Sequence, residues 1–164
     1  MKTGVKFYRF EDALSIKKSR FYPYKASKRV GFKHEFYLGV GGNLGDTRLI
    51  FDRFFKKFRS DKRFHIVKSS PLLLNKAFGF KDQPDFLNAV ILAQTSLSPK
   101  ATLKVTAHFE RIFKRKRSFK NAPRTLDLDI LWHSAKTLPR DKRLILPHPG
   151  VMSRVSVIVP FGLM

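Results

Sequence analysis

The sequence contains no cysteine, and its 12 acidic residues face 34 Lys and Arg. The absence of cysteine excludes a disulfide framework, a thiolate zinc site and a thiol nucleophile. A cytoplasmic location is the default expectation for such a chain. The shortage of acid leaves a formal net charge of +22, which attracts polyanions such as nucleic acid, a nucleoside triphosphate or an anionic membrane. Charge alone does not choose among these partners.

Long apolar runs are also missing. No stretch approaches the roughly 20 residues that span a bilayer, and the first 34 residues contain no signal-peptide core. A soluble protein without membrane association is therefore expected. Within 164 residues, 43% hydrophobic side chains and 17 Phe are enough for one domain with an apolar core.

Residues 1–34 carry ten basic and two acidic side chains, interleaved with aromatic residues, and show no regular hydrophobic period. We expect a basic N-terminal extension that packs loosely on a single domain formed by residues 35–164. The functional alternative is a basic arm that touches a polyanion.

The pattern from residue 35 onward predicts alternating strands and helices. A strand over 35–40 ends at a glycine cluster, and Asp46 then caps a helix with an aromatic face. Strands are expected at 64–71, 85–93 and 125–133, and Ser98-Pro99 starts a second helix that runs to about residue 115. Residues 72–84 and 114–124 are expected to be loops, and the tail shows only short apolar runs. The order predicts an α+β, ferredoxin-like βαββαβ sandwich with an antiparallel sheet covered by helices.

The most informative segment runs from Pro123 to Leu131. Alternation along a strand puts Asp127 and Asp129 on one face and the neighbouring leucines on the other. Two such carboxylates repel each other, so either protein cations or a bound hard metal must compensate them. Oxygen ligands without cysteine favour Mg²⁺. The alternative is a pair neutralised by Arg124 and surface lysines.

Residues 111–124 hold seven Lys and Arg and no acid. Such a run is normally a solvated surface, but beside a Mg²⁺ pair it predicts a triphosphate clamp, because arginine matches phosphate oxygens in bidentate geometry. Phe86 and Asn88 share a strand face and could stack on and read a flat heterocycle, although taken alone they are ordinary sheet residues. The glycine cluster does not fit G-x-G-x-x-G, since the third glycine would fall on Leu44.

Taken together, five segments resemble the 6-hydroxymethyl-7,8-dihydropterin pyrophosphokinase family over about residues 36–160. They appear in the family's order, and the run Pro-Arg-Thr-Leu-Asp-Leu-Asp-Ile is the most specific. The segments are 39–46, 82–89, 115–117, 123–131 and 146–149.

This resemblance implies a folate-pathway enzyme that moves the β,γ-diphosphate of ATP to the pterin's hydroxymethyl oxygen and releases AMP. It implies that Asp127 and Asp129 bind two Mg²⁺ ions and act in catalysis with Arg115 and Arg124. The implied ATP-binding residues are Arg115, Arg117, Arg124, Ile130, Arg143, His148 and Arg154. The implied pterin-binding residues are Asn43, Phe78, Phe86 and Asn88, assisted by backbone groups of the loop around Asn75 to Phe78. A monomer is expected.

The chain departs from the family pattern at four positions. The family usually has serine at Gly42, often tyrosine at Phe86, often tryptophan at Asn121, and an aromatic residue at Ser156, so the pterin is expected to be stacked on one side. Two other functions stay open: an RNA-binding ferredoxin-like module, and a noncatalytic nucleotide-binding relative. RNA binding is disfavoured, because two in-register aspartates would lie where phosphate should bind.

Overall fold

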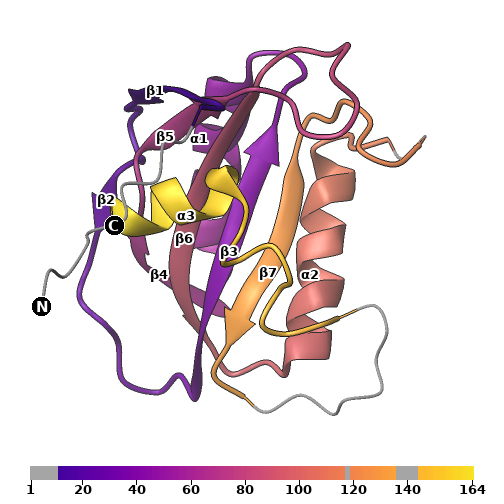
Figure 1. Ribbon diagram of the computed structural model, residues 1–164. Coiled ribbons are helices and arrows are strands. Elements are labelled where there is room, and N and C mark those ends of the chain that lie inside the picture. The colour runs from indigo at the N-terminus through magenta and orange to yellow at the C-terminus, as the bar shows by residue number, and fades with distance from the viewer. Residues whose placement is uncertain (1–10, 117–118, 136–143) are drawn as a thin grey trace, which may run out of the picture.

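The computed structural model describes residues 11–116, 119–135 and 144–164. These residues form three helices and one antiparallel sheet of seven strands, which confirms the α+β class (Figure 1). Within the described residues no helix has the length and apolar character needed to cross a membrane.

The centre of the sheet consists of two long neighbouring strands, β3 (His34–Gly42) and β6 (Phe86–Thr95). On its other edge β3 pairs with β7 (Asp127–His133). The second edge of β6 is shared by β4 (Phe64–Ser69) and β5 (Leu72–Asn75). The four strands expected from the sequence are β3, β4, β6 and β7. Their spatial order in the sheet is β7-β3-β6-β4.

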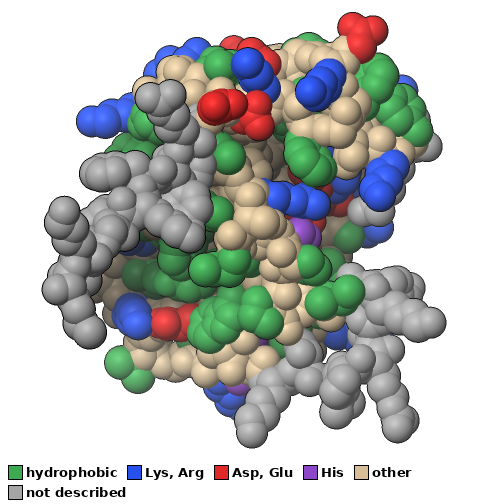
Figure 2. Space-filling view, viewed as in Figure 1, with side chains coloured by type: hydrophobic (Ala, Val, Ile, Leu, Met, Phe, Trp, Pro, Cys, Tyr) green, Lys and Arg blue, Asp and Glu red, His purple; other side chains and the backbone are tan. Residues whose placement is uncertain are grey.

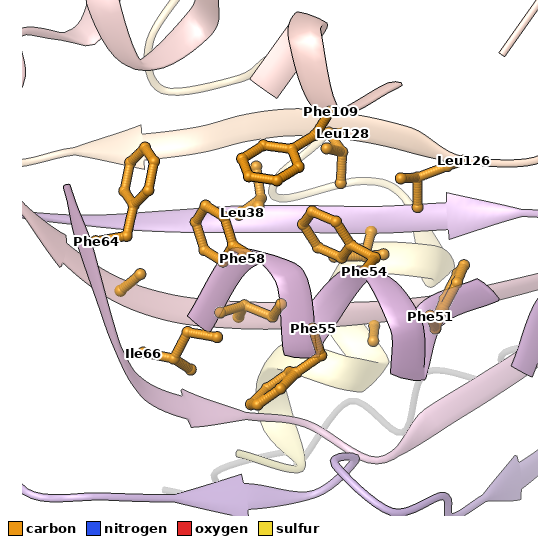
Figure 3. Close-up of a cluster of buried hydrophobic side chains, with 14 of the residues drawn as sticks. Leu38, Phe51, Phe54, Phe55, Phe58, Phe64, Ile66, Phe109, Leu126 and Leu128 are labelled. Atoms are coloured by element: carbon orange, nitrogen blue, oxygen red, sulfur yellow. The ribbon is translucent and has the colours of Figure 1, made fainter. Parts of the chain in front are cut away.

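Helices α1 (Thr47–Ser60) and α2 (Pro99–Ile112) pack on one face of the sheet. As expected, Asp46 accepts a hydrogen bond from the Leu49 N–H at 3.0 Å and Ser98 caps α2. Figure 3 shows that α1 points its phenylalanines at the strands and that Phe109 of α2 meets them. The fully buried aromatic side chains of α1 are Phe51, Phe54, Phe55 and Phe58. This face is the main core.

The opposite face carries helix α3 (Val155–Gly162), which crosses in front of β6 in Figure 1. The sequence pattern predicted only a short apolar run here, because Val and Ile favour strands. Val157 packs with Val90 of β6 and Leu131 of β7 in a second, smaller buried cluster. Packing on the sheet thus overrides the local preference of a β-branched segment.

Three strands were missed because their sequences carry little periodic signal. β5 lies inside the expected loop 72–84, and β1 (Ala13–Lys17) and β2 (Tyr24–Lys25) lie inside the basic extension. β1 pairs with β5 through backbone hydrogen bonds, and its side chains are mostly exposed. β2 pairs with β4, and its Tyr24 ring also packs on Phe55 at 5.0 Å.

The extension also contributes to the core, more tightly than the loose packing expected from its composition. Tyr22 is fully buried against Phe51 and Phe55, and Phe21 stacks on Phe55 at 4.8 Å. The guanidinium groups of Arg20 and Arg59 each lie 5.4 Å from the Phe21 ring. The mixture of basic and aromatic residues therefore forms cation–π packing at this point.

Candidate active site

The two aspartates of β7 lie on the α3 side of the sheet, opposite glycines of β3. Asp129 is paired with Gly39 and Asp127 with Gly41, while Leu128 and Ile130 point into the main core. The glycines place no side chain beside the carboxylates, and a cavity of about 370 Å³ opens on this face. It is lined by Asp12, Asn75, Phe78, Phe86, Asn88, Arg124, Asp127, Asp129, His148, Arg154, Ser156 and neighbouring residues.

The space-filling view in Figure 2 shows this face of the molecule. Acidic, basic and histidine side chains meet near its centre, and apolar side chains surround them. An enclosed group of both charges at a concave surface is typical of a site for an ionic ligand.

Asp127 is held by two arginines. Arg115 Nη1 lies 2.5 Å from Asp127 Oδ1, and Arg124 Nε lies 3.2 Å from Asp127 Oδ2. The second contact is an ion pair without hydrogen-bond geometry, so the buried Nε of Arg124 has no hydrogen-bond partner among the described residues. A partly buried guanidinium whose buried Nε has a spare donor is suited to an anionic ligand.

Arg115 is itself fixed by Glu110 of α2. The Glu110 side chain is 7% exposed; it forms an ion pair with Arg115 and accepts a hydrogen bond from the Leu128 N–H at 2.9 Å. The carboxylate therefore ties the end of α2 to β7. No sequence motif marks Glu110, although it is the only acidic residue between 104 and 124.

Asp129 has a different environment. No ion pair or hydrogen bond joins its carboxylate to another of the residues that the structure describes. Burial, and next the charge of Asp127, raise the pKa of Asp129, while His148, Arg115 and Arg154 oppose that rise. The site therefore contains one compensated carboxylate and one that is costly to ionise.

This pair fits a hard divalent cation. Both donors are carboxylate oxygens lining one cavity, and a nearby cation would offset the repulsion that raises the Asp129 pKa. No cluster of three or more His, Cys, Asp or Glu suited to a metal is found in the described ranges. The protein would supply two carboxylates, and Mg²⁺ typically takes its remaining ligands from water and phosphate.

Phe86 and Asn88 lie on the neighbouring strand β6 and line the same cavity, as expected. The Arg124 guanidinium lies 5.1 Å from the Phe86 ring, and Asn88 donates to the Asn75 side chain at 2.6 Å. The aromatic plate and the amide are thus within one pocket with the carboxylates.

His148 and Arg154 reach this cavity from the segment before α3. His148 accepts a hydrogen bond from the Gly150 N–H at Nδ1, 3.0 Å away, and the backbone N–H of His148 donates to the Leu131 carbonyl. Arg154 lies 5.7 Å from the Phe78 ring. A second cavity of about 410 Å³ borders the first at Asn121 and Arg124, and Arg115, Lys116 and Lys120 line it.

Two other predicted residues, Asn43 and Ile130, line neither of these two cavities. Asn43 is 6% exposed and links three loops, donating to Gln83 and Pro84 and accepting from the Arg124 N–H. Ile130 is 3% exposed within the core, which leaves only its backbone for a nucleotide contact. Arg117 and Arg143 lie outside the described residues.

Asp12 also lines the cavity, and its position could not be read from the sequence. It reaches the site only because β1 pairs with β5, and no local pattern marks that pairing.

The fold and the site together define a small α+β enzyme whose cavity combines charged side chains of both signs with apolar ones. The model of the 7,8-dihydro-6-hydroxymethylpterin-pyrophosphokinase family matches residues 37–163. The chain belongs to this family, as its motifs indicated.

Relatives in several bacteria share this assignment. The 2-amino-4-hydroxy-6-hydroxymethyldihydropteridine pyrophosphokinase of Campylobacter jejuni is 50% identical over 148 residues, which cover 90% of this chain and 94% of that protein. The enzyme of the same name from Helicobacter pylori is 41% identical over 88% of this chain and 90% of that protein. The one from Aquifex aeolicus is 36% identical over 76% of each chain.

Proposed function

We propose that this protein transfers the β,γ-diphosphate of ATP to 6-hydroxymethyl-7,8-dihydropterin in tetrahydrofolate biosynthesis. The hydroxymethyl oxygen forms a bond to the β-phosphorus, and the bond from that phosphorus to the α,β-bridging oxygen breaks. AMP leaves with the bridging oxygen, and the hydroxyl proton passes to solvent. The observation that carries the proposal is the pair of carboxylates, Asp127 and Asp129, that line one cavity, with Asp127 held by Arg115 and Arg124.

Asp127 and Asp129 are the residues that would hold Mg²⁺, and we propose two ions. When bound, Mg²⁺ supplies charge neutralisation at the phosphate oxygens. Arg115 and Arg124 would turn from Asp127 toward the triphosphate, because a phosphate ligand offers them stronger charge-assisted hydrogen bonds. His148 and Arg154 line the same cavity and would contact phosphate from the side of α3.

Phe86 and Asn88 would position the pterin. The Phe86 ring offers one stacking surface, and Ser156, which replaces the aromatic residue of the family pattern, lines the same cavity, which supports one-sided stacking. The Asn88 amide would hydrogen-bond to the ring edge. Because both substrates are then held in one cavity, positioning supplies much of the rate enhancement.

Three structural proposals accompany this function. The order β7-β3-β6-β4, with helices after β3 and β6, supports a ferredoxin-like core to which β1, β2 and β5 are added. We propose that residues 35–164 are the catalytic domain, with 1–34 as its extension. Monomeric state and cytoplasmic location stay predictions.

The function is tested by incubating purified protein with ATP, Mg²⁺ and 6-hydroxymethyl-7,8-dihydropterin and measuring AMP. We expect AMP formation that requires all three components and stops with EDTA. Release of ADP, or AMP formation that does not depend on pterin, would contradict the proposal. Family membership does not favour the RNA-binding alternative, and salt-sensitive oligonucleotide binding that survives Asp127→Ala would revive it.

A further inference from the structure

Strand β1 directly follows Asp12, which lines the cavity, although both precede the residues that the family model matches. It pairs with β5 at four positions, from Lys17 opposite Leu72 to Ala13 opposite Asn75. Beyond the last pair, the Lys76 N–H donates to the Asp12 carbonyl at 3.0 Å. Figure 1 shows β1 beside β5 at one margin of the sheet. β1 therefore fixes the backbone of β5 where that strand ends.

Asn75, at the end of β5, is 6% exposed, and its side chain is hydrogen-bonded to that of Asn88. Asn75 Nδ2 lies 2.9 Å from the Lys76 carbonyl, which can only accept a hydrogen bond, so Nδ2 must donate. Asn75 Oδ1 is then the atom that faces Asn88, at 2.6 Å, and Asn88 must present its own Nδ2 there. These contacts fix which way the Asn88 amide is turned.

The remaining atom of that amide, Asn88 Oδ1, points across Gly41. A Cβ atom placed on Gly41 would come within 2.8 Å of it, so the absence of a side chain keeps this oxygen open to the cavity. The site thus presents a carbonyl acceptor of fixed direction. A flat heterocycle whose edge carries N–H donors, as a pterin does, is complementary to it.

We propose that β1 is a positioning element for the pterin: through Lys76 and Asn75 it holds the Asn88 amide with its oxygen toward the ring. The inference rests on the proposed function and concerns the extension that had no assigned role. Without β1, the outer edge of the four-residue β5 loses its ladder and the Lys76 N–H loses its acceptor. The hydrogen bond between the Asn75 and Asn88 side chains is then no longer held in one geometry, and the Asn88 oxygen loses its fixed direction.

A pair of truncations tests this element. Removal of residues 1–17 deletes β1, and removal of residues 1–10 leaves it in place. We expect the first truncation to raise the KM for the pterin about tenfold, the value of one hydrogen bond of about 1.4 kcal/mol, and to leave the KM for ATP within about twofold. The shorter truncation should match the full chain in both constants.

Asn75→Ala provides a double-mutant cycle. If β1 acts through Asn75, deleting residues 1–17 from the Asn75→Ala protein should raise the pterin KM less than about twofold further. Additive losses, equal losses for ATP and pterin, or an unchanged pterin KM in the 1–17 truncation would each overturn the proposal.

A second comparison leaves β1 in place in case the longer truncation does not fold. Lys76→Pro removes the N–H that donates to Asp12, and the extended conformation of Asn75 tolerates a following proline. Lys76→Ala removes the same side chain but keeps the N–H. A higher pterin KM in the proline variant than in the alanine variant supports the role of β1, and equal values refute it. A full-length protein that forms no AMP would instead refute the proposed function.

Discussion

The two aspartates of the site should respond to the same substitution with stability changes of opposite sign. In Asp127→Asn, Arg115 and Arg124 lose a charged partner whose side chain is 17% exposed. Arg115 keeps its ion pair with Glu110, but Arg124 loses the counter-charge that the described residues give it, and removing one partner of such a partly buried charged pair typically costs about 1–3 kcal/mol. We therefore expect the free energy of unfolding to fall by that amount.

Asp129→Asn should raise the free energy of unfolding. Because burial and Asp127 raise the pKa of Asp129, its contribution to stability is present below the unfolded value of 3.8 and is lost as pH rises through the folded pKa. At pH 7, which lies above the unfolded value, the raised pKa of Asp129 therefore opposes folding. Replacing Asp129 with a neutral side chain of the same shape should raise the free energy of unfolding by about 1 kcal/mol, because substitutions that remove an unfavourable group from a functional site often stabilise the fold.

The assay is urea denaturation of the two variants and the unchanged protein at pH 7 in EDTA. Both variants should lack AMP formation, and the advantage of Asp129→Asn should shrink as the pH is lowered. Added Mg²⁺ should stabilise the unchanged protein more than either variant. An Asp129→Asn protein less stable than the unchanged one in EDTA would refute this account of the electrostatics.

Three further predictions concern stability. Tyr22→Phe removes a buried hydroxyl without a partner among the described residues and should stabilise the protein by up to about 1 kcal/mol in urea denaturation; a loss above that size would contradict it. Burial, and next His34, lower the pKa of His133 to about 4, so the stability given by the neutral ring is complete above 6.5 and is lost as pH falls toward 4. That loss should reach about 2–3 kcal/mol and be absent in His133→Asn. Gly42→Ser should cost about 1–3 kcal/mol, because its Cβ would lie 2.6 Å from the Thr125 carbonyl; an unchanged melting temperature would count against the packing described.

Much of the site was predictable because strand alternation is a strong local rule. It correctly placed Asp127 and Asp129 on one face and the leucines on the other. It also predicted that Phe86 and Asn88 share a face, and both line the cavity. The aromatic period of α1 likewise predicted the core face.

What could not be predicted depends on partners distant in sequence. β1 and β5 are short and pair with each other, and β5 also pairs with β6. Helix α3 packs on the sheet through Val157, which contacts Val90 and Leu131. Glu110 was missed for the same reason, since its structural role depends on contacts with Arg115 and the Leu128 N–H, which its own helix does not reveal.

The most direct test of pyrophosphoryl transfer is a single-turnover reaction followed by phosphorus NMR, with enzyme in excess over ATP and 6-hydroxymethyl-7,8-dihydropterin. The account predicts equal amounts of AMP and a pterin that carries two linked phosphates, and neither product with Asp129→Asn. Formation of ADP with a pterin monophosphate, or of AMP with free pyrophosphate, would contradict it.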